Sequence, residues 1–271
     1  MVQYEWLIPL GLSLGAFGTL IGAGGGFVLV PVLLLLYPQA SPTTITAISL
    51  AVVFFNALSG SWAYGRKKWI DYKSGLLFAA ATVPGAILGA LTTEYIPRRP
   101  FNLILGLLMI LSAVYLWVFR VGASVSKAAQ STDPRAEESN QKKADTGLFY
   151  NLKYGMGLSL AVGYISSLLG IGGGIIHVPA LVSLLKFPVH IATATSHFIL
   201  VIMALTGTLV HIASGSFAQG GVRQTLYLAA GVLIGAQIGA AISARVHGVW
   251  IIRALALALV FVGIRLLVMA V

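Results

Sequence analysis

Long apolar runs alternate with short polar stretches along the whole chain. Eight of these runs are long enough to cross the hydrocarbon core of a bilayer, which takes about 20 residues as a helix. They span residues 5–37, 43–64, 74–96, 100–121, 154–185, 190–214, 221–244 and 249–271. None shows the alternating polarity of a barrel strand, so the pattern predicts an all-α polytopic membrane protein.

The first and fifth runs are too long for a single crossing. Residues 6–37 would form a helix of about 48 Å, against a hydrocarbon core of roughly 30 Å. Each of the two runs contains a cluster of glycines, GAGGG at 22–26 and GIGGG at 170–174. Each run therefore predicts two helices that meet at the glycines, either as a re-entrant hairpin or as two full crossings. The total becomes about 8 to 10 membrane segments.

The chain also repeats itself. Gly22 and Pro31 correspond to Gly170 and Pro179 at an offset of 148 residues. TAISLAVVFFNALSG at 46–60 matches TATSHFILVIMALTG at 193–207, and GAILGA at 85–90 matches GAQIGA at 235–240. Three collinear matches indicate an internal duplication. We assign residues 1–121 to a first repeat, the polar residues 122–148 to a linker and residues 149–271 to a second repeat.

The positions of the Lys and Arg residues indicate on which side of the membrane the linker and the termini lie. Hydrophobic residues make up 58% of the chain and charged residues only 9%, far below the soluble average of roughly 25%. Although the net charge is +10, most Lys and Arg residues lie between the apolar runs, where they report topology. Counting them favours two inverted repeats in the cell (inner) membrane, with a cytoplasmic linker and both termini outside the cytoplasm. The chain has no cysteine, which excludes disulfides and thiolate metal sites.

An inverted repeat with interrupted helices is typical of secondary transporters, whose substrate binds at the repeat interface near the middle of the membrane. A helix that restarts there presents unpaired N–H groups and a positive partial charge, which suit an anion. Glycine lets the backbone turn and lets a ligand approach it. The candidate substrate-binding glycines are Gly24, Gly25, Gly26, Gly172, Gly173 and Gly174. Close helix packing is the alternative role, and for Gly85, Gly89, Gly235 and Gly239 it is the preferred one.

Polar side chains within the spans supply further candidates. These are the hydroxyls of Thr46, Ser49, Thr195 and Ser196, the amides of Asn56 and Gln237, and the imidazole of His197. The alternative for each is a hydrogen bond within or between helices. His177 and His211 are the other histidines within spans. Because the spans contain no well-buried Asp or Glu, a carboxylate cation site is disfavoured.

The duplicated GxGGG with Pro five residues later, the ATSHFILVIMALTG segment and GAQIGA together resemble the TauE/SafE family of sulfite and organosulfonate permeases. The resemblance covers nearly the whole chain. It implies an inner-membrane transporter that moves sulfur oxyanions, usually outward. It also implies that the two glycine triplets, Ser49, Thr195 and Ser196 contribute to the site. The first repeat reads TAISL where the second reads TATSH, so the two halves need not contribute equally.

The sequence thus predicts a secondary transporter that exports small sulfur-containing oxyanions by alternating access. An anion channel, or an uptake permease for anions such as thiosulfate or sulfate, is the alternative, and a scaffold or receptor without flux is a third. GLSLG at 11–15 matches a serine-nucleophile pattern, but it lies within an apolar helix, so we expect no enzyme and no catalytic residue. We expect a small anion and membrane lipid as partners, no cofactor, no metal and no nucleic acid. A homodimer is left open.

Overall fold

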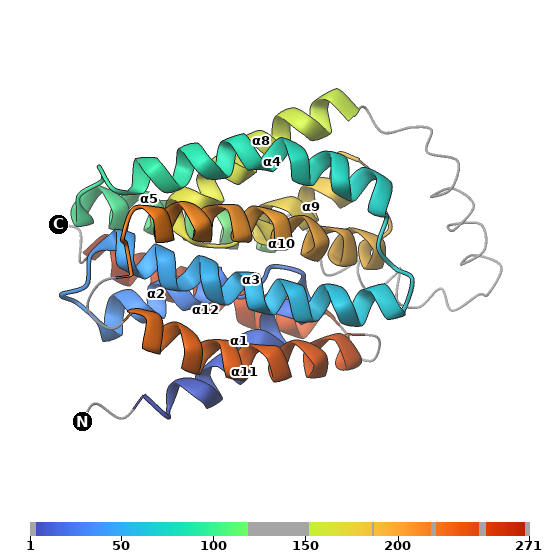
Figure 1. Cartoon of the computed structure of the whole chain (residues 1–271). Coiled ribbons are helices and arrows are strands. Elements are labelled where there is room, and N and C mark those ends of the chain that lie inside the picture. Colours follow the sequence, from blue (N-terminus) through green and yellow to red (C-terminus); the bar gives the residue numbers. More distant parts are fainter. Residues whose placement is uncertain (1–3, 119–151, 186, 218–220, 244–247, 269–271) are drawn as a thin grey trace.

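The computed structural model of the chain describes residues 4–118, 152–185, 187–217, 221–243 and 248–268 (Figure 1). These residues form ten α-helices and no strand. The helices of the first half are α1 (Leu7–Ile21), α2 (Gly26–Leu36), α3 (Pro42–Arg66), α4 (Tyr72–Thr93) and α5 (Arg98–Val118). Those of the second half are α8 (Leu152–Leu169), α9 (Gly174–Ser183), α10 (Val189–Ala213), α11 (Gly221–Ile242) and α12 (Gly248–Val268). The predicted linker, residues 122–148, lies outside the described residues.

The prediction of an all-helical polytopic membrane protein is confirmed. Among the described residues, α3, α4, α10 and α11 are each long and apolar enough to cross a membrane. Large apolar side chains point outward from these helices, including Leu88 of α4 and Ile234 of α11, which are 58% and 57% exposed. Since lipid tails are the natural neighbours of such side chains, the outer surface fits a bilayer.

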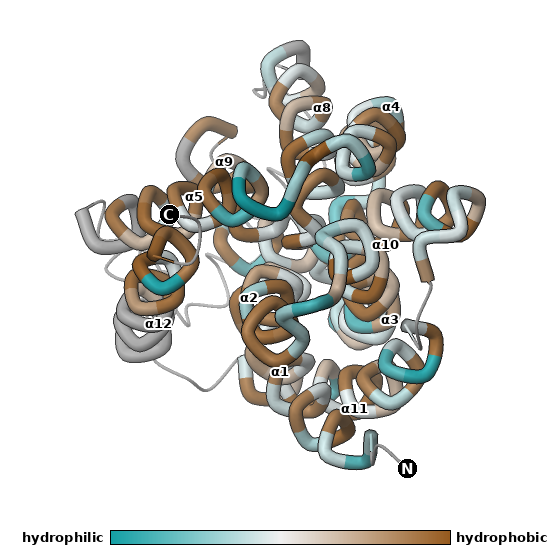
Figure 2. The backbone as a smooth tube through the Cα atoms, turned by 90° about the vertical axis from the view of Figure 1, so that its left-hand side faces the viewer, coloured by the Kyte–Doolittle hydropathy of each residue, from teal (hydrophilic) through white to brown (hydrophobic). Residues whose placement is uncertain are grey.

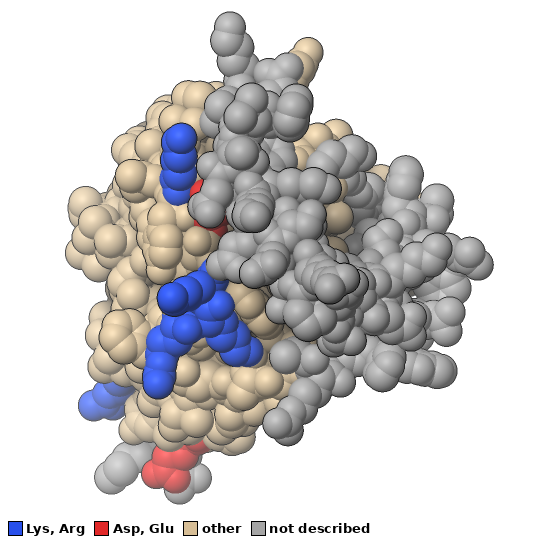
Figure 3. Space-filling model, turned by 90° about the vertical axis from the view of Figure 1, so that its right-hand side faces the viewer, with Lys and Arg blue, Asp and Glu red and all other residues tan. Residues whose placement is uncertain are grey.

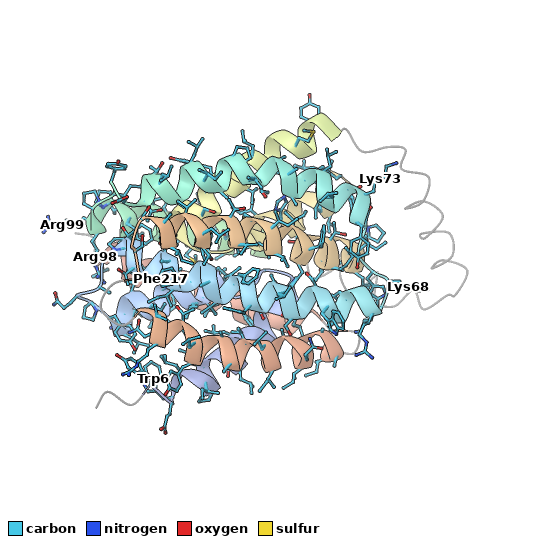
Figure 4. The ribbon with its side chains drawn as sticks, in the orientation of Figure 1. Trp6, Lys68, Lys73, Arg98, Arg99 and Phe217 are labelled. Carbon is cyan, nitrogen blue, oxygen red and sulfur yellow. The ribbon has the colours of Figure 1, made fainter. Side chains whose placement is uncertain are left out.

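The two overlong apolar segments form re-entrant hairpins. Helix α2 has 11 residues and α9 has 10, which at 1.5 Å per residue is only about 15–16 Å, half the thickness of the hydrocarbon core. Helix α1 starts near Trp6, and Arg98 donates to the carbonyl oxygens of Leu34 and Ala40 beside the end of α2. Trp6 and Arg98 lie at the same end of the bundle (Figure 4). The first hairpin therefore enters and leaves on one side.

Equivalent helices of the two halves run in opposite directions. Helix α3 ends near Lys68, whereas its counterpart α10 ends near Phe217 at the other end of the bundle (Figure 4). The packing repeats accordingly: α1 against α11 mirrors α8 against α4, and α3 against α11 mirrors α10 against α4. Helix α3 also packs on α10, and α5 on α12. Two inverted repeats related by a pseudo-two-fold axis are the simplest description of this arrangement.

Seen nearly end-on, α3 and α10 lie together on one side of the bundle, between the pair α4–α8 and the pair α1–α11 (Figure 2). The pair α5–α12 lies on the other side, and α2 lies between the two sides. The tips of both hairpins, residues 22–27 and 166–175, are buried by the surrounding helices. Irregular backbone in a membrane is tolerated where protein surrounds it in this way.

Small residues bring the paired helices into backbone contact. A Cβ atom on Gly85 or Gly89 would overlap backbone atoms of α8, and one on Gly235 or Gly239 would overlap backbone atoms of α1. This confirms the packing role predicted for the four glycines. Because lipid provides no hydrophobic force between helices, such close contact is a main source of cohesion in a membrane bundle.

The loop between α3 and α4, at one end of the bundle, contains a helix cap and several basic residues. Asp71 caps α4 by accepting hydrogen bonds from the N–H groups of Lys73 and Ser74. This end carries Arg66, Lys67, Lys68 and Lys73. The space-filling view from this end shows a cluster of Lys and Arg side chains, with others apart from it (Figure 3). We call this end of the bundle the basic end. Arg98, Arg99 and Phe217 lie at the opposite end (Figure 4).

We predict that Gly235→Ala lowers the thermal unfolding midpoint of the detergent-solubilised protein. The added methyl group would overlap Leu12 and Ala16 backbone atoms, and overpacking of this kind costs about 1–3 kcal/mol. Gly157→Ala is the matched control, because nothing lies within 4 Å of its Cβ position. That variant should be neutral or stabilised by up to about 1 kcal/mol through helix propensity. Equal midpoints for the two variants would contradict the packing assignment.

Candidate functional site

The tips of the two hairpins meet in the interior of the bundle. Residues 22–27 form the first tip and residues 166–175 the second, and all of them are buried. A Cβ atom on Gly26 would lie 2.7 Å from the carbonyl oxygen of Gly170, and one on Gly174 would overlap the carbonyl oxygen of Gly22. The two glycine turns therefore touch backbone to backbone across the repeat interface.

Backbone conformation accounts for the remaining glycines of each turn. In the first tip, Gly22, Gly24 and Gly25 have φ values of 84°, 74° and 80°. Their equivalents in the second tip, Gly170, Gly172 and Gly173, have φ values of 70°, 71° and 29°. Residues with a side chain rarely adopt such angles. Each triplet thus combines two positions that need positive φ with one that needs close approach.

Both tips contain unpaired N–H groups. The N–H groups of Gly25, Gly26 and Phe27, where α2 starts, have no acceptor among the described residues. Those of Gly172 and Ile175, where α9 starts, also have none there. Two helices thus begin in the buried interior with positive partial charge at their N-termini. An anion is the ligand that such an arrangement accommodates.

Buried side chains add unpartnered donors to the tips, among them Thr46 and Ser166. The hydroxyls of Thr46 and Ser166 are fully buried and have no hydrogen-bond partner among the described residues. Ser166 Oγ lies 3.0 Å from the Cβ position of Gly173, at the start of α9. The Cα atom of Thr46 lies 3.0 Å from the Cβ position of Gly170. Since buried hydroxyls normally find a partner, these two are available to a ligand.

Ser49 and Ser196 hold the two halves together. The Ser49 hydroxyl donates to the carbonyl oxygen of Gly170 at 2.6 Å, and the Ser196 hydroxyl donates to the carbonyl oxygen of Gly22 at 3.3 Å. Each bond runs from one repeat to the glycine turn of the other. In this conformation both hydroxyls therefore donate to backbone carbonyl oxygens, so neither proton is available to a ligand.

Thr195 and Gln237 lie away from the turns. Thr195 Oγ1 accepts a hydrogen bond from the N–H of Asp71 at the start of α4. Gln237 Nε2 donates to the carbonyl oxygen and the hydroxyl of Ser59, which joins α11 to α3. The geometry thus gives both side chains helix-linking contacts, which matches the packing alternative for Gln237.

Asn56 and His197 belong to a separate polar cluster between the glycine turns and the basic end. The Thr19 hydroxyl donates to Asn56 Oδ1 at 3.1 Å, and the Tyr64 hydroxyl donates to the Thr19 carbonyl oxygen at 2.9 Å. The His197 ring meets the Tyr64 ring edge-on at 5.5 Å between centroids. His177 is elsewhere, with Nε2 3.1 Å from the Ser159 hydroxyl.

Comparison with known proteins gives the family. The model of the family described as "Sulfite exporter TauE/SafE" matches residues 7–266. The chain belongs to the TauE/SafE family. It is 32% identical to the "Probable membrane transporter protein YunE" of Bacillus subtilis (strain 168), over 98% of each chain. It is 24% identical to the "Probable membrane transporter protein MJ0441" of Methanocaldococcus jannaschii, over 78% of this chain and 73% of that protein. No solved structure matches significantly.

Membership of the TauE/SafE family places the protein among membrane transporters. The structure also adds buried residues near the glycine turns and the polar cluster that the sequence did not single out as candidates: Ser166, Thr19, Tyr64 and Gly60. A signal for Gly60 was present, because ALSG at 57–60 is repeated as ALTG at 204–207. The repeat gives no such signal for Ser166, since the residue at the equivalent position, 148 residues earlier, is Gly18.

We predict that Ser49→Ala lowers the free energy of unfolding by about 1 kcal/mol, the usual contribution of one hydrogen bond. Ser196→Ala should cost less, because its bond is longer. Thermal unfolding of the solubilised protein measures both. Ser13→Ala is the control, since that hydroxyl donates to Pro9 within the same helix. If Ser49→Ala and Ser13→Ala have the same unfolding midpoint, the hydrogen bond between the repeats does not contribute to stability.

Proposed function

We propose that the protein is a secondary transporter for small sulfur-containing oxyanions, such as sulfite or organosulfonates, and that the substrate binds between the two glycine turns. The observation that carries the proposal is that two helices start with unpaired N–H groups at adjacent turns in the buried interior. Those of Gly25, Gly26 and Gly172 are examples. The name of the family model, with its reference to sulfite export, supports the choice of anion.

The chemistry of the turns suits an oxyanion. Tetrahedral or pyramidal oxygens accept several hydrogen bonds at once, and the hydroxyls of Thr46 and Ser166 add two donors to the backbone groups. None of these donors brings a full positive charge, so the site binds through many weak dipoles. Such a site releases its anion readily, as a transporter requires.

Close packing of the tips favours a carrier over an anion channel. Gly26 and Gly174 contact the backbone of the opposite turn, so the two repeats are packed against each other at this level. Passage of an anion then requires the two hairpins to move apart and re-form, as in alternating access. Saturable flux with counter-transport distinguishes this mechanism from a channel.

The distribution of Lys and Arg residues supports an orientation in the membrane and a direction of transport. We propose that the basic end faces the cytoplasm of a cell with an inner membrane, following the positive-inside rule, with both termini on the other side. A negative interior then favours export, since the membrane potential contributes about 2.3 kcal/mol per charge per 100 mV. An uptake permease for thiosulfate or sulfate-like anions is the alternative in direction.

We predict that Ser166→Ala raises the KM for sulfite about tenfold in proteoliposome flux. The variant removes a hydrogen bond to a charged ligand, which is worth about 1.5–3 kcal/mol. The folded protein loses no internal hydrogen bond, because the Ser166 hydroxyl has none among the described residues. The unfolding midpoint should therefore stay unchanged, which separates binding from stability. Ser13→Ala is the control. An unchanged KM in Ser166→Ala would remove this hydroxyl from the site.

We also predict that flux of a singly charged sulfonate depends on membrane potential. In proteoliposomes with potassium gradients and valinomycin, a potential that is negative inside should speed efflux and slow uptake of methanesulfonate. The physical reason is movement of net charge across the bilayer. Flux of methanesulfonate that saturates but ignores the potential would overturn the charge-moving mechanism. Absence of any anion flux would overturn the proposed function itself.

A further inference from the structure

The polar cluster around Gly60 has an unusual composition for the interior of a membrane bundle. Asn56, Gly60 and Tyr64 are spaced four residues apart, so they share one face of α3. Thr19 of α1 and His197 of α10 face them. The side chains of Asn56, Thr19, Tyr64 and His197 are each at most 1% exposed. Polar groups this deep normally form a complete hydrogen-bond network, because leaving one unpaired is costly.

This network is incomplete at two atoms. Asn56 Nδ2 and His197 Nε2 have no hydrogen-bond partner among the described residues. His197 Nε2 borders the surface that Gly60 leaves without a side chain, and Asn56 lies one helical turn before Gly60 on the same face of α3. His197 Nε2 lies 3.0 Å from the Gly60 Cβ position, and the Thr19 methyl group lies 3.2 Å from it. Exchanging the oxygen and nitrogen of the Asn56 amide would still leave one polar end unpaired.

The hydrogen bonds determine what each atom can offer. His197 Nδ1 lies 3.3 Å from the carbonyl oxygen of Thr193, which can only accept, so Nδ1 carries the proton. In the neutral ring Nε2 is then an acceptor. Asn56 Oδ1 accepts from Thr19, so Asn56 Nδ2 is a donor. His197 of α10 thus offers one acceptor and Asn56 of α3 offers one donor. Thr19 joins the two, because its hydroxyl donates to Asn56 and its methyl group lies beside the Gly60 position that His197 Nε2 also approaches.

The other repeat lacks this pair. The equivalents of Asn56 and His197 at the offset of 147 residues are Met203 and Leu50. Leu50 and Ser167 face Gly207 as His197 and Thr19 face Gly60. The pseudo-symmetric position thus has equivalent side-chain contacts but no imidazole and no amide, and the Ser167 hydroxyl beside it has no hydrogen-bond partner among the described residues. Helix packing alone explains the glycine in both halves, and it does not explain the unpaired imidazole and amide of the cluster around Gly60.

The cluster is continuous with the basic end. Tyr64 lies two residues before the end of α3. The Lys67 ammonium lies 6.0 Å from the centroid of the Tyr64 ring and 4.7 Å from that of Trp69. Lys67 donates to the carbonyl oxygen of Ala240, and burial lowers the pKa of its ammonium group. Lys67 and Tyr64 are thus the ionisable groups next to His197 along α3. An anion that moves from the basic end toward the glycine turns passes this cluster.

We propose that Asn56 and His197 form a second substrate station, on the basic side of the glycine turns, which selects oxyanions that carry one proton. The proton of such an anion is donated to His197 Nε2, and one of its oxygens accepts from Asn56 Nδ2. Hydrogensulfite has this pattern, whereas a sulfonate has no proton to donate. The station rests on the proposed function, because it acts on the anion that the glycine turns bind. Since Gly60 contacts His197, α3 and α10 separate at this level when the anion enters.

Equilibrium binding tests the station. Titration calorimetry of the solubilised full chain at slightly acidic pH, where sulfite is mainly hydrogensulfite, compares sulfite with methanesulfonate. The intact protein should bind sulfite more tightly. In His197→Leu, which installs the residue found at position 50 of the other repeat, the Kd for sulfite should rise about tenfold. The Kd for methanesulfonate should change less than about twofold in the same variant.

His211→Leu is the matched control, because His211 is also a buried histidine of α10 with an unpartnered Nε2. It should leave the ratio of the two Kd values unchanged. His197→Gln keeps an acceptor and should retain part of the preference, which guards against a folding defect in His197→Leu. Equal weakening of both anions in His197→Leu and His197→Gln would overturn the station. So would the absence of a sulfite preference in the intact protein, although the proposed function would then stand. If neither anion binds the intact protein, the proposed function fails first.

Discussion

The structure depends on the contact between two glycine turns in the middle of the bundle. Gly26 rests on the Gly170 carbonyl and Gly174 on the Gly22 carbonyl, so the two re-entrant hairpins support one another. Neither hairpin could stand alone in lipid, because each exposes unpaired backbone groups at its tip. The surrounding pairs, α1 with α11 and α4 with α8, complete the enclosure. Ser49 and Ser196 add one hydrogen bond from each half to the opposite turn.

The same contact links fold and function. Positive φ angles at positions such as Gly24 and Gly172 turn the chain within a few residues, and the next helix then starts with its N–H groups unpaired. A break that would be a defect in a plain span thus leaves unpaired N–H groups in the interior, which is the basis of the anion site proposed above. Both hairpins place such a break at the repeat interface, where transporters built from inverted repeats bind their substrate.

Much of this architecture could be predicted from the sequence, because membrane constraints are simple. Segment length alone indicated broken helices at 22–26 and 170–174, and the charge pattern indicated inversion. Side-chain roles were harder to predict. Ser49 looks like a free hydroxyl in the sequence, yet its proton goes to Gly170 of the other repeat. Gln237 looks like a candidate ligand and instead joins α11 to Ser59. Such long-range partners follow from how the helices pack, which no local pattern encodes.

Anion binding at the paired turns is the central claim, and anomalous diffraction from crystals of the intact protein soaked in selenite tests it most directly. Selenite keeps the shape of sulfite and replaces sulfur with a strong anomalous scatterer. The account predicts selenium density between the turns, with oxygens in hydrogen-bonding reach of the N–H groups of Gly25, Gly26 and Gly172. Selenium bound at other places in the bundle, with no density between the turns, would contradict it.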